Sequence, residues 1–281
     1  MSGRLVVCPT PIGNLEDVTL RVLSALREAD VVACEDTRRT RILLDRYGVK
    51  AKLVSYHEHN ERARSAELVG RMRDGAVVAL VSDAGMPLVS DPGYVLVQAC
   101  VAAGLPVEVL PGPSAAITAL VASGLSADEW HFHGFLPRKK GELRELLARA
   151  SSTLIAFESP RRLPATLALL AEVDPDREAA VCRELTKAHE EIVRGTAAEL
   201  AERYAGGPPK GEVVLVVAPP AGAGRGAGAS GPRSAEAPDP AAVDALRKLV
   251  DAGAHPRKAA TVIASLTGTS ANALYRALTS E

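Results

Sequence analysis

The sequence has no strong charge of either sign and no long hydrophobic run. Its 281 residues include 33 Lys and Arg against 34 Asp and Glu, so the formal net charge is -1. A uniformly basic nucleic-acid-binding protein is therefore excluded, and any such contact must be a local patch. No segment approaches the roughly 20 apolar residues that span a bilayer. The N-terminal apolar run, from Leu5 to Cys8, is shorter than a signal peptide requires. We expect a soluble, cytoplasmic protein that does not enter the membrane.

Cysteine is scarce, and two common nucleotide-binding motifs are absent. The cysteines lie in apolar stretches without metal-like spacing, at Cys8, Cys34, Cys100 and Cys182. This pattern predicts buried free thiols in a reducing compartment. There is no Walker loop, and the single Gly13 after the first expected strand does not make a G-x-G-x-x-G fingerprint. A dinucleotide site is therefore poorly supported.

Short β-rich runs alternate with helical patterns through residue 217, which predicts an α/β fold around a mostly parallel sheet. We expect strands at 4–8, 30–34, 52–56, 76–81, 106–110, 130–135, 152–157, 179–183 and 212–217. The intervening helices are expected at 19–29, 41–48, 61–73, 94–104, 139–149, 161–171 and 196–204, with another that follows residue 114.

The pattern pauses at GLSADEW, and the chain is long enough for two ordinary domains. A later stretch rich in Gly, Ala and Pro has no apolar periodicity, as is typical of a flexible linker. We predict an N-terminal α/β domain at 1–123, a second α/β domain at 124–217, a flexible linker at 218–240 and a helical extension at 241–281. The extension fits either a helix-turn-helix or a helical hairpin that packs on a partner.

Three loops rich in Gly and Pro follow expected strands. They read CPTPIGNLED (8–17), LVSDAGMPLVSDPG (80–93) and LPGPSAAITAL (110–120). In α/β sheets, ligands bind at the carboxyl ends of strands, and glycine lets the main chain approach a ligand closely. The loops predict a small-molecule site built more from main-chain than from side-chain atoms. An ornate structural turn is the alternative for 80–93.

The helices after two of these loops have recognisable start and stop signals. Asp91 is expected to cap one helix, with Pro92 at its first position and Gly104 at its end. Ser114 is expected to cap the next helix, which Gly124 ends. The main-chain amides behind Ser114 would suit a carboxylate or phosphate group of a ligand.

Charged residues cluster after other strands. The segment CEDTRRTRILL (34–44) is either a capped helix with a solvated charged face or a carboxylate pair beside anion-binding arginines. Basic residues also occur in RKKGELR (138–144) and SPRR (159–162). His57 and His59 would share a face if they lay on a strand, but no convincing third ligand accompanies them. We expect no metal site.

Six segments resemble one family when they are taken together and in order. They are PTPIGNLEDVTLRVLSALREADVVACEDTRRT, SDAGMPLVSDPG, PGPSAAITAL, FHGFLPRKKGEL, FESPRRL and CRELTKAHEEIVRGT. The chain is similar over residues 4–217 to the bacterial ribosomal RNA small subunit methyltransferase I family, within the tetrapyrrole methylase superfamily. Any one loop would be weak evidence, but six in register make the resemblance specific.

The resemblance implies two α/β domains of tetrapyrrole-methylase type with a small C-terminal helical extension, usually as a homodimer. It implies S-adenosylmethionine as the cofactor and 2'-O-methylation of a decoding-centre cytidine in 16S rRNA. The partner would be 16S rRNA or the small ribosomal subunit. Carried onto this sequence, the cofactor pocket would involve Pro9, Ser82, Asp83, Ala84, Gly85, Met86, Val89, Ser114, Ala115 and Leu185.

The resemblance leaves the catalytic group open. Glu35, Asp36 and Lys187 are candidates for the base or for an orienting group. Lys187 would need a lowered pKa to act as a base, and as a cation it would instead bind phosphate. The candidates for contact with the RNA backbone are Arg38, Arg138, Arg161 and Arg162. Two alternatives remain: a precorrin-type tetrapyrrole methyltransferase, and a nucleic-acid-binding regulator that uses its C-terminal helices.

Overall fold

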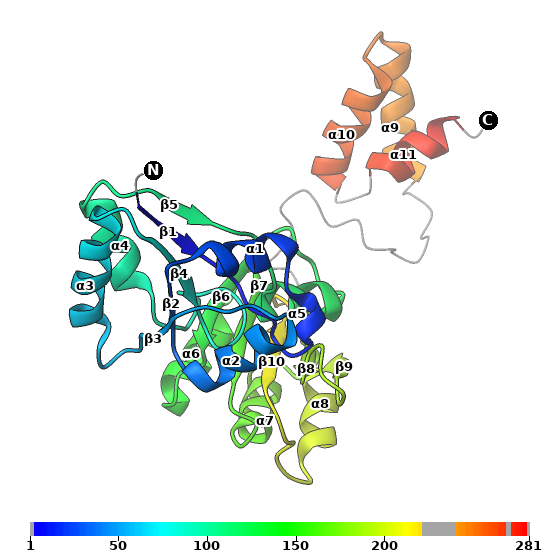
Figure 1. Ribbon diagram of the computed structural model, residues 1–281. Helices are drawn as coiled ribbons and strands as arrows, with labels where there is room; N and C mark the ends of the chain where they lie inside the picture. The colour runs from blue at the N-terminus through cyan, green and yellow to red at the C-terminus, as the bar shows by residue number, and fades with distance from the viewer. Residues whose placement is uncertain (1–2, 221–239, 268–270, 280–281) are drawn as a thin grey trace. The chain divides into compact units, whose positions relative to one another are not determined.

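The computed structural model describes residues 3–220, 240–267 and 271–279, which belong to two compact units (Figure 1). The first unit, Met1–Ala227, contains two β-sheets, and the second, Gly228–Glu281, contains only helices among its described residues. None of the described helices combines the length and the hydrophobicity that a membrane crossing requires.

The first sheet consists of five parallel strands in the order β3-β2-β4-β1-β5. The strands are β1 (Arg4–Val7), β2 (Val31–Cys34), β3 (Leu53–Ser55), β4 (Val77–Val81) and β5 (Val107–Val109). The central strands are short apolar runs, as is typical of parallel strands that are covered on both faces. The parallel arrangement confirms the prediction from the alternating pattern.

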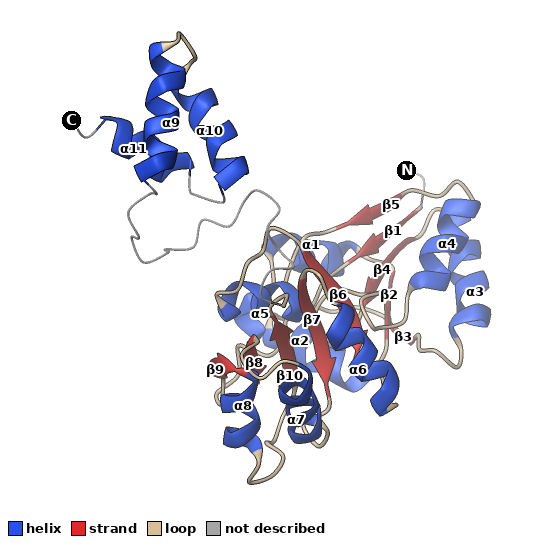
Figure 2. Ribbon diagram, turned by 180° about the vertical axis from the view of Figure 1, so that it is seen from behind, coloured by secondary structure: helices blue, strands red, loops and turns tan. Residues whose placement is uncertain are grey.

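Helices cover both faces of this sheet (Figures 1 and 2). They are α1 (Leu20–Glu28), α2 (Thr37–Arg46), α3 (Glu61–Arg73) and α4 (Tyr94–Ala102), and a short 3₁₀-helix, η1 (Leu15–Asp17), precedes α1. Successive side chains of β1 point to opposite faces. Leu5 and Val7 pack with α3 and α4, whereas Val6 packs with α1 and α2. The sheet is therefore the middle of three layers.

The start of α4 differs from the prediction that Asp91 caps it and Pro92 opens it. The helix begins at Tyr94, and Gly93 occupies the N-cap with a φ of 140°. Only glycine adopts that conformation easily. The preceding loop already turns through a left-handed residue, Leu88, with a φ of 74°. The chain completes its turn before the helix starts, which leaves Asp91 in the loop.

The second sheet has the order β6-β7-β10-β8-β9, and only β6 and β7 are parallel. The prediction of a mostly parallel sheet is therefore wrong for this part of the chain. Its strands are β6 (Trp130–Phe135), β7 (Thr153–Glu158), β8 (Glu178–Arg183), β9 (Glu191–Thr196) and β10 (Val213–Val217). The sequence analysis missed β9. This edge strand is only half-buried and has no clear alternation of apolar residues, so its stability comes from pairing with β8.

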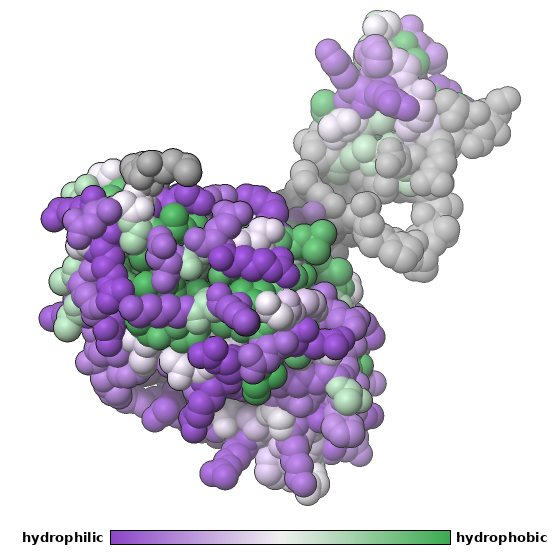
Figure 3. Space-filling view, viewed as in Figure 1, coloured by the Kyte–Doolittle hydropathy of each residue, from purple (hydrophilic) through white to green (hydrophobic). Residues whose placement is uncertain are grey.

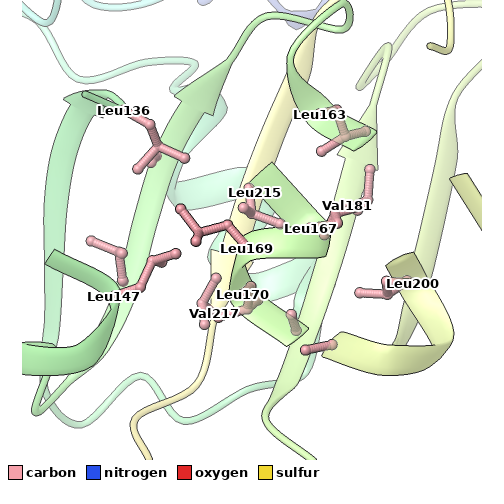
Figure 4. Close-up of a cluster of buried hydrophobic side chains, with 14 of the residues drawn as sticks. Leu136, Leu147, Leu163, Leu167, Leu169, Leu170, Val181, Leu200, Leu215 and Val217 are labelled. Carbon is pink, nitrogen blue, oxygen red and sulfur yellow. The ribbon is translucent and has the colours of Figure 1, made fainter. Parts of the chain in front are cut away.

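Helices also cover both faces of the second sheet: α5 (Ala115–Ser123), α6 (Lys140–Arg149), α7 (Leu163–Val173) and α8 (Ala197–Tyr204). On one face, leucines from α6, α7 and α8 pack over β7, β8 and β10 (Figure 4). On the other face, α5 packs against Ile155, Ala180 and Val216. Ser114 takes the N-cap of α5, and Gly124 ends it in the left-handed conformation, as predicted. Helix α5 thus packs on the second sheet although it follows the first in sequence, and the domain limits at 123 and 217 stay predictions.

All four cysteines are buried free thiols, as the sequence predicts. Burial raises the pKa of Cys8 to about 12 and that of Cys100 and Cys182 to about 11. The thiols therefore stay protonated at neutral pH and act as small apolar side chains.

The second unit contains α9 (Pro240–Asp251), α10 (Pro256–Thr267) and α11 (Ala271–Thr279). The three helices share a core of their own that includes Leu246, Ile263 and Leu274. Helices α10 and α11 lie where the extension was predicted. Most of the predicted linker (residues 221–239) and residues 268–270 between these helices lie outside the described residues.

Candidate functional site

The loops that follow β4, β1 and β5 meet at the carboxyl edge of the first sheet, where these strands are neighbours. The main chains of Thr10 and Gly85 exchange two hydrogen bonds of 2.9 Å, which join the loop after β1 to the loop after β4. Gly112, after β5, lies against Pro9: a Cβ atom at Gly112 would come within 2.4 Å of Pro9 Cγ. The three loops therefore form a single wall.

The loop after β4 is held in an unusual conformation. Leu88 and Ser90 have positive φ values of 74° and 66°, and Gly85 and Gly93 have values of 78° and 140°. A non-glycine residue in this region costs about 1–3 kcal/mol, and such residues concentrate at ligand sites. The Leu88 side chain compensates by packing into the apolar core beneath the loop. The conformation supports a ligand-binding role over an ornate turn.

A cavity of about 310 Å³ lies between this wall and the second sheet. The first-sheet side contributes Ile12, the loop residues 84–86 and 89–91, and the start of α5 at 114–116. The second-sheet side contributes Phe135, Phe157, Glu158, Pro160, Cys182, Leu185 and residues 211–214. Both halves of the unit are therefore needed to enclose the cavity.

The charge of the cavity wall has one sign. Asp91, Glu158 and Glu212 line it, and no Lys or Arg is among the described residues of the wall. The remaining wall is largely apolar and includes Ile12 and Leu185, which belong to one apolar cluster. A partly enclosed cavity with these properties attracts a cationic ligand that also has apolar surface.

Asp91 lies in the part of the wall where carboxylates crowd together. Burial, with the nearby charges of Glu35 and Asp83, raises its pKa to about 6. Burial also raises the pKa of Glu35, again with a contribution from Asp83. Neighbouring carboxylates cannot all ionise without cost, so this group holds a proton more tightly than an isolated aspartate does.

The start of α5 offers hydrogen-bond donors to the cavity. Ser114 occupies the N-cap, but its side chain forms no capping hydrogen bond. The first main-chain amides of a helix have no partner within the helix. Ser114, Ala115 and Ala116 all line the cavity, so these amides are placed to bind a polar group of a ligand.

Seven of the ten residues predicted for the cofactor pocket line this cavity: Ala84, Gly85, Met86, Val89, Ser114, Ala115 and Leu185. The other three support the wall from behind. Pro9 packs against Gly112, and the Ser82 hydroxyl lies 3.3 Å from the Gly85 carbonyl oxygen. Asp83 accepts hydrogen bonds from the Asp36 amide at 3.0 Å and from Arg39 at 3.2 Å. It thereby joins the loops after β2 and β4.

The three candidates for the catalytic group have different surroundings. The Asp36 carboxylate accepts hydrogen bonds from the Arg38 guanidinium at 2.8 and 3.1 Å, and these lower its pKa to about 2. Lys187 lies 2.9 Å from both Glu184 and Glu212. Burial lowers the pKa of Lys187, but its hydrogen bonds with the two carboxylates outweigh burial and raise it overall. Both groups are therefore charged at neutral pH, and neither is a ready proton acceptor. The pKa of Glu35 moves in the direction that a base requires.

The candidate RNA contacts differ in their availability. Arg138 and Arg161 are exposed, and neither forms an ion pair with another described residue. Arg38 is also exposed, although it is paired with Asp36. Arg162 is half-buried, donates a hydrogen bond to the Leu136 carbonyl at 3.1 Å and lies 3.4 Å from Glu158. Its guanidinium thus holds the loop after β6 in place.

Sequence reasoning missed several residues of the cavity wall. The segment Asp91-Pro92-Gly93 predicts a helix cap, but it also belongs to the loop 80–93, whose glycines and prolines predict a ligand site. Glu158 and Phe157 end β7, and Phe135 ends β6. These positions follow the rule that strand ends line ligand sites, but the rule alone did not select them.

The pair His57 and His59 lies in the turn before α3 and not on a strand. Their ring centroids are 5.9 Å apart, and Asn60 lies 3.3 Å from His57 Nε2. No group of three His, Cys, Asp or Glu side chains within the described ranges is placed to hold a metal ion.

Residues 4–201 match the family model of the tetrapyrrole (corrin/porphyrin) methylases. A ribosomal RNA small subunit methyltransferase I from Mesorhizobium japonicum is 47% identical over 279 residues, which cover 98% of this chain and 90% of the relative. A protein of the same name from Thermotoga maritima is 44% identical over 217 residues, which cover 76% of this chain and 98% of that protein.

Solved structures share the fold at lower identity. Uroporphyrin-III C-methyltransferase from Thermus thermophilus, complexed with S-adenyl homocysteine, has a TM-score of 0.54 and 23% identity over 76% of this chain and 97% of its own. A diphthine synthase has a TM-score of 0.58 and 18% identity over 77% of this chain and 90% of its own. These likenesses extend across both sheets.

Asp91→Asn is expected to stabilise the first unit. The pKa of Asp91 is raised from 3.8 to about 6, so the carboxylate destabilises the fold above pH 6, and this effect disappears as pH falls and the folded form takes up its proton. With allowance for solvent screening of this partly exposed group, the variant should raise the free energy of unfolding by about 1–2 kcal/mol at pH 8, and by progressively less as the pH falls from 6 toward 4. The fluorescence of Trp130, the single tryptophan, reports this unit in urea titrations.

The matched control is Asp36→Asn, because the pKa of Asp36 is shifted in the opposite direction. This variant should lower the free energy of unfolding at pH 8. A destabilised Asp91→Asn protein at pH 8, or a gain in stability that grows toward pH 5, would contradict the placement of Asp91 among buried carboxylates.

Proposed function

The chain belongs to the ribosomal RNA small subunit methyltransferase I family within the tetrapyrrole methylases, and from this premise we propose that it methylates the ribose 2'-hydroxyl of a decoding-centre cytidine in 16S rRNA. It is an S-adenosylmethionine-dependent methyltransferase of small-subunit ribosomal RNA. The proposal concerns the atom, the nucleotide and the residues that take part.

The charge of the cavity is the observation that carries the proposal. Acidic residues and no described basic residue line the cavity. The Glu158 carboxylate is buried, but Asp91 and Glu212 provide negative charge that suits the positively charged sulfonium of S-adenosylmethionine. Arg138 and Arg161 are exposed in the segments that follow Phe135 and Pro160 of the wall. An acidic interior beside exposed arginines fits a cationic cofactor inside and a polyanionic RNA outside.

The residues of the wall fit this cofactor. When bound, it supplies an activated methyl group on the sulfonium sulfur. The amides at the start of α5 are placed to bind its polar groups, and the Gly85 main chain, Met86 and Leu185 would enclose the rest. Their main task is orientation, because holding the two reactants in line can supply about 7–11 kcal/mol of the barrier.

We assign the role of proton acceptor to Asp91. It lines the cavity, and its pKa of about 6 leaves it ionised but basic at neutral pH. The Asp91 carboxylate would accept the proton of the ribose hydroxyl during methyl transfer. Glu35 supports this role by raising the pKa of Asp91. Asp36 would position Arg38, and Lys187 would hold Glu184 and the wall residue Glu212 in place.

The RNA backbone would contact the exposed arginines. Arg138, Arg161 and Arg38 present charged groups to solvent, and phosphate contacts of this kind position an RNA without reading its sequence. Arg162 would act indirectly, since its guanidinium holds the main chain next to Arg138 through the Leu136 and Pro137 carbonyl groups.

The first unit alone would carry the reaction. The Thermotoga relative is matched over 98% of its length by 217 residues, fewer than the first unit contains. This supports an accessory role for the second unit and argues against a regulator that acts only through its C-terminal helices. The precorrin-type alternative finds less support, because a three-carboxylate wall repels a carboxylate-rich tetrapyrrole.

We further propose that the protein acts in the cytoplasm, where its ribosomal substrate is found. We also propose that it is a homodimer. Ile117 and Val121 lie one turn apart on α5, and both are exposed although the opposite side of this helix is buried. Figure 3 shows further apolar surface among hydrophilic atoms on one face of the first unit. Such surface is typical of a protein–protein contact.

The purified protein should transfer labelled methyl groups from S-adenosylmethionine to small ribosomal subunits that lack the modification. Mapping should place the label on the ribose of one decoding-centre cytidine. Residues 1–227 should retain the transfer. Label on a base, or no label on any ribosomal substrate, would refute the proposed reaction, and fully modified subunits serve as the negative control.

Asp91→Asn should lower kcat about 10²- to 10⁴-fold, because the proton acceptor is lost. The wild-type rate should fall as pH drops below about 6, where Asp91 becomes protonated, and the variant should lack this dependence. Glu212→Gln is the matched control, since it removes another carboxylate from the wall. It should weaken cofactor binding with little change in kcat. Equal losses of kcat in both variants would reduce Asp91 to an electrostatic role.

Val121→Glu should shift the protein from dimer to monomer in light-scattering measurements, because a buried charge would be left unpaired in the contact. The control is Val101→Glu, which changes an exposed apolar residue on a different helix, α4. This variant should remain a dimer. A wild-type protein that is monomeric at micromolar concentration would rule out the dimer.

A further inference from the structure

The fold leaves one aromatic side chain, that of Phe135, mostly exposed. Phe135 lines the cavity, yet 64% of it is exposed, so it lies at the cavity opening. Aromatic residues make up only 3% of the chain. An exposed phenylalanine next to an enclosed site points to contact with a ligand that reaches the site from outside.

The local structure directs Phe135 to this position. The pairing of β6 with β7 shifts register between Phe132 and Phe135, so that Phe135 lies opposite Phe157. Such bulges re-aim side chains next to active sites. Phe135 and Phe157 form an edge-to-face contact, with ring centroids 5.5 Å apart and planes at 65°. Phe157 packs against the core below and supports the exposed ring.

The same bulge brings Phe135 beside the loop of the proposed proton acceptor. A Cβ atom at Gly134, which has a φ of 75°, would lie 3.5 Å from Ser90 Oγ. Ser90 precedes Asp91, and both line the cavity with Phe135. The opening therefore combines an aromatic face with a carboxylate, and exposed Arg138 and Arg161 follow closely in the sequence.

We propose that the target nucleobase stacks on Phe135, so that its ribose faces Asp91 and its flanking phosphates contact Arg138 and Arg161. This inference rests on the proposed function and names the form of substrate that the site accepts. The substrate is an unpaired nucleotide, turned out of its RNA stack, and not a paired one.

The reaction itself requires an aromatic platform, that is, a ring on which the displaced base can stack. A ribose hydroxyl in a helical stack cannot enter an enclosed cavity, so the nucleotide must leave the stack. Proteins that bind unpaired RNA replace the lost stacking with aromatic side chains. A phenylalanine accepts any base, which leaves the choice of nucleotide to the surrounding rRNA. Phe135 would thus be a positioning residue for the ribose.

The test is a series of substitutions at Phe135, assayed with small ribosomal subunits that lack the modification. Phe135→Ala should lower kcat/KM for subunits about 5- to 150-fold, the range expected for one lost stacking contact. Phe135→Leu should lose nearly as much, because it keeps the apolar volume but not the aromatic face. Phe135→Tyr and Phe135→Trp should keep the wild-type value within about threefold. Trp130→Ala, an exposed aromatic at the other end of β6, is the control and should retain activity.

Two binding measurements separate this proposal from the proposed reaction. The dissociation constant for S-adenosylhomocysteine, from calorimetry, should be the same for the wild type and the Phe135 variants. A single-stranded RNA of decoding-centre sequence with pyrrolocytidine at the target position should lose fluorescence on binding to the wild type, but not to Phe135→Leu.

The outcomes are distinct. Full activity of Phe135→Leu, or cofactor binding weakened as much as activity in Phe135→Ala, would overturn the platform. If the wild type fails to methylate any subunit, the proposed reaction is wrong. The fluorescence change then tests by itself whether the base stacks on Phe135. Quenching that depends on Phe135 would still support it, and no quenching by the wild type would overturn it.

Discussion

Two main-chain hydrogen bonds between Thr10 and Gly85 are the constraint on which the site depends. They fix the loop after β1 to the loop after β4 at the edge of the first sheet. The loop after β1 also reaches the second sheet, because the Asn14 amide donates a hydrogen bond to Thr186 at 3.0 Å. Gly13 makes this approach possible, since a Cβ atom there would come within 2.5 Å of the Lys187 side chain. One loop thus sets the separation of the two walls of the cavity.

Acidic and basic residues are separated locally in this protein. The chain as a whole is almost neutral, yet Asp91, Glu158 and Glu212 share one cavity and Arg138 and Arg161 are exposed close to its wall in the sequence. The ion pairs behind the wall maintain this arrangement. Arg162 contacts Glu158, and Lys187 contacts Glu184 and Glu212. Each cation therefore neutralises part of the acidic wall from the protein side.

Much of the fold could be predicted from the sequence, because it depends on local pattern. Short apolar runs, helical periodicity and Gly or Pro at loop ends located the parallel sheet and most of the helices. Strand β9 could not be found in this way, since its half-exposed side chains have no periodicity and its partner β8 supplies the hydrogen bonds. The packing of α5 on the second sheet is likewise a tertiary outcome that the spacing of its own residues does not encode.

The site was predictable at the level of loops and less so at the level of side chains. The rule that ligands bind at strand ends led to the three loops, and the family resemblance named seven residues that line the cavity. The rule and the resemblance did not identify Asp91 or Phe135. Their positions depend on left-handed residues in one loop and on a register shift in β6, and neither feature follows from the spacing of apolar residues.

The acidic wall should also favour the exchange of spent cofactor for fresh cofactor. The spent cofactor would lack the sulfonium charge once its methyl group has gone, and an acidic wall would then attract it less. The cavity should therefore hold fresh donor more firmly, relative to the neutral thioether, than an uncharged cavity would, and it should favour exchange of one for the other. The ratio of the two dissociation constants measures this preference, and it should diminish when Glu212 is replaced by glutamine.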